Sequence, residues 1–263
     1  MKYFVVDSFT TEPFKGNPAG VCIVDTFPSD EIMQNIAAEN RLSETAFTCK
    51  RADGNYDLRF FTPGAEVDLC GHATLGTSYV LSHFVEPEQK EFHFHTNHDE
   101  LTIRCLEGDL FEMDFPSWKP EPVAVTNAMR EALGFEPEGA WLTRDLMFLV
   151  KDAETVRNFQ PNLTAIKAVP EGCGFFLTAK NENDESDFVC RTFFPKIAID
   201  EDPVCGSANC TLIPFWSERL GKNKLVNYQL SKRSGFVYGK NEGDRVKISG
   251  HVKLYSIGEI NLS

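Results

Sequence analysis

Short apolar runs in which every second residue is polar recur along the chain, and glycine, proline and asparagine separate them. A period of two is typical of half-buried strands. In the first half the predicted strands are residues 2–6, 19–24, 45–49, 56–61, 91–96, 101–105 and 110–115. In the second half they are residues 141–150 and 174–179, with further strands after residue 225. Few helices interrupt them, so the pattern predicts an α+β protein with largely antiparallel sheets.

Helices are predicted at four places. Ser29 can cap a helix that has one apolar face and acidic residues in its first turn, where the helix dipole favours them. Thr126 can cap another helix that ends at Leu133. Two apolar helices open at the Cys-Gly-x-Ala motifs that begin at Cys70 and Cys205. The second of these contains Pro214, which should kink it and leave one backbone carbonyl to find another partner.

The length of 263 residues exceeds the usual size of one domain, so two domains are expected. The stretch SWKPEPVAVT, which follows Pro116, contains proline and glutamate and is the candidate linker. The predicted domains are residues 1–117 and 118–263, and the last strand can return to the first domain.

An internal repeat indicates that these two domains are alike. Residues 46–84 and 175–220 share five features in the same order. These are a strand ending in lysine, a polar turn, an Arg-x-Phe-x-Pro strand, an acidic loop, and Cys-Gly-x-Ala opening an apolar helix. The shared order predicts a duplication whose halves are related by a pseudo-twofold axis.

Charge and cysteine usage narrow the possible partners. The formal net charge of −13 makes nucleic acid and anionic membrane surfaces poor partners, because both would be repelled. The N-terminal segment lacks the apolar region of a signal peptide and no apolar stretch could span a bilayer, so a soluble, cytoplasmic protein is expected. The 8 cysteines form no CxxC pair and are expected to be reduced thiols, most of them in the core.

The two Cys-Gly-x-Ala motifs are the strongest candidates for chemistry. Backbone N–H groups at a helix N-terminus are unpaired and carry partial positive charge, so such a site binds carboxylates. A pseudo-twofold axis could bring the two helix starts face to face around a small carboxylate-bearing substrate. The side chains around that substrate would be Cys70, His72, Asp202, Cys205 and Ser207. The simpler alternative is that glycine and serine only cap two core helices.

Two thiols facing each other across a carbon acid would suit racemisation, in which one removes the α proton and the other delivers a proton to the opposite face. A helix N-terminus lowers the pKa of a thiol, whereas the acidic residues Asp68, Glu201 and Asp202 would raise it, so the direction stays open. Cys70 and Cys205 could instead be buried and inert.

Five segments resemble, in order, the signature segments of the phenazine-biosynthesis (PhzF-like) proteins, which are relatives of diaminopimelate epimerase. They are FTTEPFKGNPAGV (9–21), RLSETAF (41–47), VDLCGHATLGT (67–77), IDEDPVCGSANC (199–210) and QLSKRSG (229–235). They cover both halves, and together they are far more specific than any one of them.

This resemblance implies a diaminopimelate-epimerase-like fold of two similar domains, each with a sheet wrapped around a central helix. It also implies an active site in the cleft between the domains and a homodimer. The activity implied is that of a cofactor-independent isomerase with a biosynthetic role. Glu44 would be the acid/base, and the other implied catalytic residues are His72 and Asp202. The implied substrate-binding residues are Asn17, Gly71, Gly206 and Ser207.

The residues around Glu44 are compatible with that role. A carboxylate at the mouth of a strand among Leu42, Ala46 and Phe47 can have its pKa raised by desolvation, which suits a group that takes and returns a proton. Without the resemblance, a surface glutamate or a member of a capping box would be the simpler interpretation.

The chain departs from the PhzF-like pattern at two positions. Cys205 stands where threonine is often found, and Asn209 stands where histidine is common. Cysteine at both equivalent positions favours an epimerase or racemase, but the CGNG-type motif of the diaminopimelate enzymes is absent. The leading hypothesis is therefore a one-carboxylate isomerase, followed by a two-thiol epimerase that uses Cys70 and Cys205. The third hypothesis is a non-catalytic binding protein.

No cofactor and no metal are expected. The histidines of the HFHTNH segment, His93, His95 and His98, could suggest a metal site, but the first two alternate with phenylalanine on a predicted strand and so occupy its solvent face. The chain has no GxGxxG, Walker A or HExxH motif.

Overall fold

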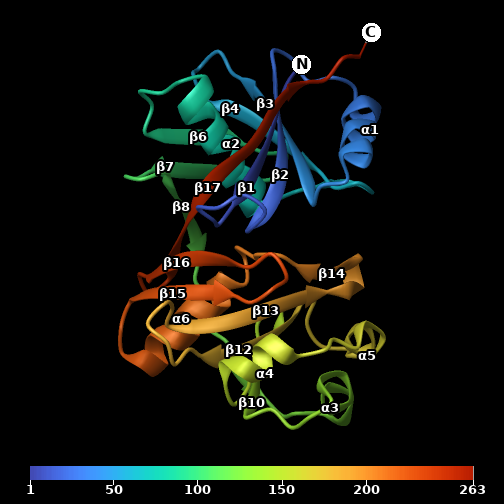
Figure 1. Ribbon diagram of the computed structural model, residues 1–263, viewed down its shortest axis with the longest axis vertical. Helices are drawn as coiled ribbons and strands as arrows, with labels where there is room; N and C mark the ends of the chain where they lie inside the picture. Colours follow the sequence, from blue (N-terminus) through green and yellow to red (C-terminus); the bar gives the residue numbers. More distant parts are fainter. Residues whose placement is uncertain (263) are drawn as a thin grey trace. The chain divides into compact units, whose positions relative to one another are not determined.

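The computed structural model describes residues 1–262. The chain divides into two compact units. Unit 1 comprises residues 1–114 and 249–262, and unit 2 is Phe115–Ile248. In each unit strands surround one long helix, α2 in the first and α6 in the second (Figure 1). The predicted fold class, two similar α+β domains each with a sheet around a central helix, is confirmed.

Unit 1 is built on nine strands. They are β1 (Lys2–Ser8), β2 (Asn17–Val24), β3 (Glu44–Lys50), β4 (Tyr56–Phe61), β5 (Glu66–Val67), β6 (Glu91–His95), β7 (Glu100–Cys105), β8 (Leu110–Pro116) and β17 (Arg245–Glu259), the last two of which cross the unit boundary. Most neighbours pair antiparallel, as the alternation predicts, but β2 pairs with β3 and β4 with β6 in parallel. The sheet is therefore mixed.

The central helix of unit 1, α2 (Gly71–Phe84), is buried on all sides from His72 to Leu81. A helix that is apolar all round needs such an enclosed position. Gly76 allows the close approach, because a Cβ at this position would lie 2.6 Å from Val6 Cγ2 of β1. The hydroxyl of Ser8, also on β1, donates a 2.7 Å hydrogen bond to the carbonyl of His72 and fixes the first turn.

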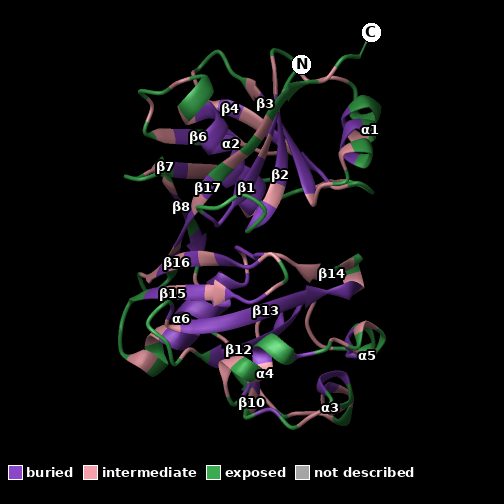
Figure 2. Ribbon diagram, in the orientation of Figure 1, coloured by how far each residue is buried: buried purple, intermediate pink, exposed green. Residues whose placement is uncertain are grey.

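The outer helix of unit 1, α1 (Asp30–Asn40), begins as predicted, since the Ser29 hydroxyl accepts a hydrogen bond from the N–H of Ile32. Its apolar face, Met33, Ile36 and Ala37, packs on a cluster that includes Phe47 of β3. Figure 2 shows that the opposite face of the helix is exposed.

Unit 2 repeats this plan. Its strands are β9 (Glu121–Val123), β10 (Gly139–Leu142), β11 (Leu146–Leu149), β12 (Phe175–Lys180), β13 (Phe188–Phe194), β14 (Ile199–Asp202), β15 (Lys224–Gln229) and β16 (Gly235–Asn241). The parallel pairs are β11 with β12 and β13 with β15, which correspond to β2 with β3 and β4 with β6 of unit 1. The order of parallel and antiparallel pairs is thus the same in the two halves.

Short helices close the outer side of the unit 2 core. They are α3 (Asn127–Leu133), capped by Thr126 as predicted, α4 (Ala153–Asn158) and α5 (Leu163–Ala168). Their buried residues Met129, Val156 and Ile166 belong to one apolar cluster with the strands. The last two helices were not predicted, because six residues are too few to show a helical period.

The central helix of unit 2, α6 (Asn209–Leu220), contains Pro214, which cannot donate to the carbonyl of Cys210. That carbonyl instead accepts a 2.8 Å hydrogen bond from the backbone N–H of Trp118. The prediction that the proline leaves a carbonyl to another partner is confirmed, and the partner comes from the candidate linker. This bond ties the linker segment to the core of unit 2.

One predicted strand is wrong. Residues 141–150 do not form a single strand, because the chain turns at Thr143, Arg144 and Asp145 between β10 and β11. The Asp145 carboxylate is buried, accepts a 2.7 Å hydrogen bond from the N–H of Gly174 and contacts the Arg144 guanidinium at 2.6 Å. A polar pair that is satisfied by a distant glycine outweighs the apolar pattern on either side of it.

The repeated Arg-x-Phe-x-Pro strands form the same ion pair in each unit. Arg59 makes a bidentate pair with Glu66 at 2.7 and 2.8 Å, and Arg191 makes one with Glu201 at 2.7 and 3.0 Å. Each guanidinium also lies over the phenylalanine two residues further on, 5.2 and 5.1 Å from the ring centre. Identical side-chain geometry in both halves supports the duplication.

All 8 cysteines are free thiols, and five of them are buried. Within residues 1–262 none of the helices is long and apolar enough to cross a membrane.

Candidate active site

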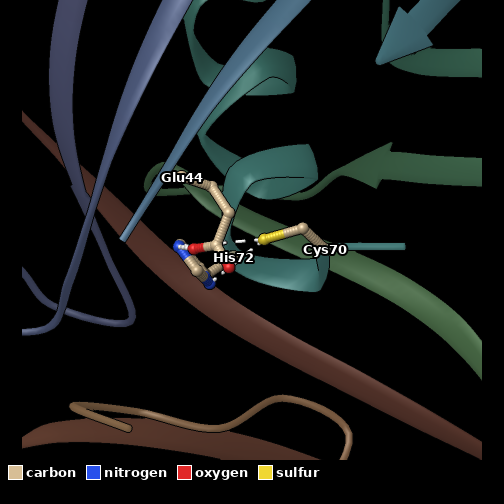
Figure 3. A group of neighbouring side chains, drawn as sticks. All are labelled: Glu44, Cys70 and His72. Atoms are coloured by element: carbon tan, nitrogen blue, oxygen red, sulfur yellow. Dashed lines mark hydrogen bonds and ion pairs between the residues drawn. The ribbon is translucent and has the colours of Figure 1, made fainter. Parts of the chain in front are cut away.

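Three buried polar side chains meet at the start of α2 in unit 1. They are Glu44, the first residue of β3, Cys70, which precedes the helix, and His72 in its first turn (Figure 3). His72 Nε2 lies 3.0 Å from Glu44 Oε2, and Cys70 Sγ lies 3.4 Å from His72 Nδ1. Their exposed fractions are 9%, 7% and 8%, respectively. The three titratable groups thus form a buried cluster, and buried clusters of this kind are common where proteins carry out acid/base chemistry.

One carboxylate oxygen of Glu44 is left without a hydrogen bond. Oε2 lies 3.0 Å from His72 Nε2, and no donor within residues 1–262 makes a hydrogen bond to this buried atom. Buried carboxylate oxygens normally have donors, so an orphaned one at a helix N-terminus is a functional signal. It is free to accept a proton from a bound molecule.

Charges within the cluster set its protonation. Burial raises the pKa of the Cys70 thiol, and the neighbouring Glu44 carboxylate raises it further. Burial alone would lower the pKa of the His72 imidazole, but its contacts with Cys70 and Glu44 raise it well above its ordinary value. The cluster therefore favours the protonated form of His72.

The neighbouring strands hold Glu44 in place. In the parallel pairing of β2 with β3, Glu44 lies opposite Ala19, close to the first residue of β2, Asn17. Asn17 is almost fully buried, and its Oδ1 accepts a 3.2 Å hydrogen bond from the Ser43 hydroxyl. The predicted binding residue Asn17 thus contacts the residue next to the carboxylate.

The first turn of α2 leaves two backbone N–H groups, those of Gly71 and His72, available to an anion beside this cluster. The N–H and the hydroxyl of Thr74 both donate to the carbonyl of Cys70, at 3.0 and 2.7 Å. The N–H groups of Gly71 and His72 have no such partner within the described chain. Unpaired N–H groups at a helix start bind carboxylates, as the sequence predicts for Gly71.

The equivalent residues of unit 2 form a turn before α6, so the prediction that this helix opens at the Cys205 motif is wrong and the helix begins at Asn209. The side chains of this turn differ from those in unit 1. Cys205 is buried, and its Sγ lies 3.5 Å from the hydroxyl of Ser207. The carbonyl of Cys205 accepts a 2.9 Å hydrogen bond from Asn209 Nδ2, which takes the place of Thr74. The backbone N–H groups of Gly206 and Ser207 have no partner among the described residues. The open N–H groups are thus repeated, but the imidazole is replaced by a hydroxyl.

The carboxylate is not repeated either. Phe47 lies opposite Arg59, and Leu177 lies opposite Arg191, so these positions correspond. Counting back three residues from each places Gly174 where unit 1 has Glu44. A Cβ at Gly174 would lie 2.4 Å from Phe194 Cε1, so any side chain there would force its neighbours to move.

Asp202 ends β14, close to Cys205. Its carbonyl accepts a 2.6 Å hydrogen bond from Gln229 Nε2, and Gln229 Oε1 accepts one of 2.9 Å from the N–H of Cys205. Burial raises the pKa of the Cys205 thiol well above its ordinary value, and the charge of Asp202 raises it further. Asp202 therefore lies beside Cys205, just before the turn that leads into α6.

Arg144, which also lies at this turn, was not among the residues predicted from the sequence. One of its guanidinium nitrogens donates a 3.2 Å hydrogen bond to the Ser207 hydroxyl, and the group lies over the Trp118 ring, 5.1 Å from its centre. A charged Arg-Asp pair inside an apolar run was the signal that could have revealed it. The facing arrangement of Cys70 and Cys205 depends on how the two units are placed and stays a prediction.

The histidine-rich segment forms no metal-ligand cluster within residues 1–262. His93, His95 and His98 each pair with a separate surface carboxylate, at 3.1, 3.3 and 2.9 Å. A surface hollow of unit 1, lined by residues that include Met1, Phe4 and Phe84, contains no residue of the cluster at α2.

Comparison with known proteins gives close matches along the whole chain. The profile of a family described as phenazine biosynthesis-like protein matches residues 6–256. An uncharacterized isomerase of Pseudomonas aeruginosa is 44% identical over 260 residues, which is 98% of this chain and 98% of that protein. An uncharacterized isomerase of Halalkalibacterium halodurans is 41% identical over 251 residues, or 94% of this chain and 93% of that protein.

Solved structures agree with these matches. The crystal structure of a PhzF-family phenazine biosynthesis protein from Enterococcus faecalis has a TM-score of 0.95 at 44% identity and covers 99% of both chains. A hydroxyproline epimerase from Agrobacterium vitis has a TM-score of 0.60 at 13% identity, over 98% of this chain and 91% of that one. At this low identity the second likeness shows the fold alone.

Proposed function

The chain belongs to the phenazine biosynthesis-like (PhzF) family, and we propose that it is a cofactor-independent isomerase that moves a proton within a small carboxylate-bearing substrate. Glu44 is the acid/base. The observation that carries this proposal is the buried, unpartnered Oε2 of Glu44, 3.0 Å from the His72 ring and beside the open N–H groups of α2.

In the proposed reaction the substrate carboxylate binds the N–H groups of Gly71 and His72. Glu44 Oε2 then removes a proton from a carbon atom and returns it to another atom on the same face of the substrate. The negative charge that develops on the substrate is stabilised by the protonated His72 and by the helix N-terminus. One carboxylate serves for both transfers, so no second base is required.

The turn before α6 in unit 2 would then contribute binding rather than proton transfer. Gly206 and Ser207 supply N–H groups and a hydroxyl, and Asp202 lies beside them, but Gly174 leaves no carboxylate in the position of Glu44. Binding of the substrate between the two domains, a homodimer and a biosynthetic role in the cytoplasm are parts of the proposal that rest on the family resemblance.

The second candidate is a two-thiol epimerase, and the observation that favours it is a buried cysteine in both Cys-Gly-x-Ala motifs. Each thiol contacts a polar group, His72 or Ser207, through which it could exchange a proton. The raised pKa of both Cys70 and Cys205 weakens this candidate, because a thiol that keeps its proton is a poor base at neutral pH.

Proton exchange in heavy water separates the two candidates. Small carbon acids that bear a carboxylate are incubated with the protein, and deuterium uptake at carbon is followed by NMR. Glu44→Gln should reduce the rate of uptake by about 10² to 10⁴-fold, while Cys70→Ser and Cys205→Ser should each retain much of it. Glu39→Gln, an exposed glutamate of α1 in the same unit, is the matched control and should leave the rate unchanged. If Glu44→Gln exchanges at the parent rate while both cysteine variants are inactive, the two-thiol mechanism replaces the proposal.

A further inference from the structure

The three side chains at the start of α2 also have the chemistry and spacing of a metal-ligand set. Glu44, Cys70 and His72 each offer one ligand atom, and these atoms all lie within 4.8 Å of one another. All three residues are buried, and one of the oxygens of Glu44 lacks a donor. We propose that this cluster binds Zn²⁺, or another thiophilic divalent cation, through Glu44, Cys70 and His72.

Two of the three distances are close to those of tetrahedral coordination. Zinc lies about 2.0 to 2.3 Å from its nitrogen, oxygen and sulfur ligands, so neighbouring ligand atoms in a tetrahedron are about 3.3 to 3.6 Å apart. His72 Nε2 is 3.0 Å from Glu44 Oε2 and 3.8 Å from Cys70 Sγ. The third distance, from Cys70 to Glu44, is at most 4.8 Å, so a side-chain movement of about 1 Å brings all three ligand atoms onto one ion.

The donor types select the ion. A thiolate and an imidazole favour zinc and cobalt over magnesium and calcium, which prefer oxygen ligands. Three protein ligands leave one position open, as in catalytic rather than structural zinc sites. Zn²⁺ binds the Cys70 sulfur, neutral His72 and the Glu44 carboxylate, and the Cys70 thiol releases its proton when it becomes a ligand. If His72 is charged beforehand, its proton is released as well.

This ligand set is distinct from the three histidines of residues 93–98, which the sequence singled out as a possible metal site and which each pair with a separate carboxylate. The new ligand set joins β3 to the first turn of α2 and does not depend on a sequence motif. Unit 2 provides an internal negative control, because Ser207 and Gly174 stand where unit 1 has His72 and Glu44. Cys205 therefore lacks two of the three ligands.

Binding can be measured without any substrate. Metal-free protein, prepared with a chelator, is titrated with Co²⁺, which occupies zinc sites and gives a thiolate-to-cobalt charge-transfer band in the near ultraviolet. We expect this band at one Co²⁺ per chain, and its loss when Zn²⁺ is added. Cys70→Ser should abolish the band, and Glu44→Gln and His72→Gln should raise the dissociation constant at least about 10-fold. Cys205→Ser should retain the band, and circular dichroism of each variant checks that it is folded.

Absence of the band at saturating Co²⁺ would overturn the proposal, as would a band that persists in folded Cys70→Ser.

The consequence for catalysis rests on the proposed function. Zn²⁺ would occupy the proton-transfer oxygen of Glu44 and block deuterium exchange, and EDTA would restore it. If the cobalt band depends on Cys70, Glu44 and His72 but Zn²⁺ leaves deuterium exchange unchanged, the metal site is supported and the catalytic role of Glu44 is refuted. Failure of the metal site and failure of the proposed function therefore give different results.

Discussion

The segments that lead into the two central helices are alike in sequence but differ in backbone and in side chains. Each contains Cys-Gly, leaves two N–H groups open and ties the cysteine carbonyl with the side chain four residues on, Thr74 or Asn209. However, α2 begins at Gly71, whereas α6 begins at Asn209 after a turn. Unit 1 adds a carboxylate and an imidazole, whereas unit 2 adds a hydroxyl and the nearby guanidinium of Arg144. The duplication thus repeats the open N–H groups in both halves, while the proposed function places the proton transfer in only one.

The largest expected difference concerns the two repeated ion pairs. Arg191 is only 10% exposed and also donates a 2.6 Å hydrogen bond to the buried carbonyl of Phe159, while Arg59 is 16% exposed and its additional partner is the exposed Asp30. Arg191→Met should therefore lower the free energy of unfolding by about 3 to 5 kcal/mol, because it leaves a half-buried Glu201 unpaired. Arg59→Met should lower it by about 2 kcal/mol. Urea denaturation measures both, and equal losses would contradict the comparison.

Gly174 tests whether unit 2 could accept a side chain in the place of Glu44. Gly174→Ala introduces a Cβ that would lie 2.4 Å from Phe194 and 2.9 Å from Asp145 Oδ1. Overpacking of this kind lowers the free energy of unfolding by about 1 to 3 kcal/mol. The control is Gly64→Ala, where no atom lies within 4 Å of the added Cβ. A fully stable Gly174→Ala protein would show that sterics do not prevent a second carboxylate.

The side chains that donate hydrogen bonds to the carbonyls of Cys70 and Cys205 should also differ in how much they stabilise the folded protein. Asn209 donates to Cys205 and accepts a 2.9 Å hydrogen bond from the buried Asn227, whereas the Thr74 side chain makes only one bond, to Cys70. We expect Asn209→Ala to lower the free energy of unfolding by about 2 kcal/mol and Thr74→Val by about 1 kcal/mol. Thermal melting of the two variants measures the difference, and the reverse order would contradict this expectation.

Alkaline pH should affect both halves in the same way. Burial raises the pKa of Cys22 in unit 1 and of Cys190 in unit 2 to about 12. A thiol of the unfolded chain ionises near pH 8.5. The buried, protonated thiol therefore contributes its full stabilisation of the folded state below that pH, and this contribution is lost as the pH rises toward the pKa of the thiol in the folded protein. Each thiol should contribute a loss of about 1.4 kcal/mol per pH unit in this interval. Cys22→Ala and Cys190→Ala should reduce the slope equally in denaturation curves at pH 8 to 11, and unequal reductions would reveal a difference between the halves.

Local patterns predicted the local features of the fold. The caps at Ser29 and Thr126, the alternating strands and the effect of Pro214 each depend on residues close together in the sequence. The break at Arg144 was marked locally only by the charged Arg144-Asp145 pair in an apolar run, because the contact that fixes it joins Asp145 to the N–H of Gly174, 29 residues away. Interactions over such separations leave no periodic signal.

The candidate site was predicted by a different route. The repeat indicated the two Cys-Gly-x-Ala motifs, but only the family resemblance indicated Glu44, since nothing in its own segment distinguishes it from a surface glutamate. That Glu44 meets both His72 and Cys70 follows from packing β3 against α2, which a pattern of residues does not encode. The proposed metal-ligand set has no sequence signal for the same reason.

The pairing of β1 with β17 has a consequence for the order in which the halves form. Lys2 lies opposite Glu259, so unit 1 must join the two ends of the chain, whereas unit 2 is the single continuous segment Phe115–Ile248. Contacts between distant residues form late because loop closure is entropically unfavourable. During synthesis unit 2 can therefore fold before β17 is available to pair with β1. Until then β1 is an open sheet edge, while more than 100 residues emerge from the ribosome. The half that bears Glu44 is thus the last to mature and the one most exposed to chaperones and to mispairing on the way.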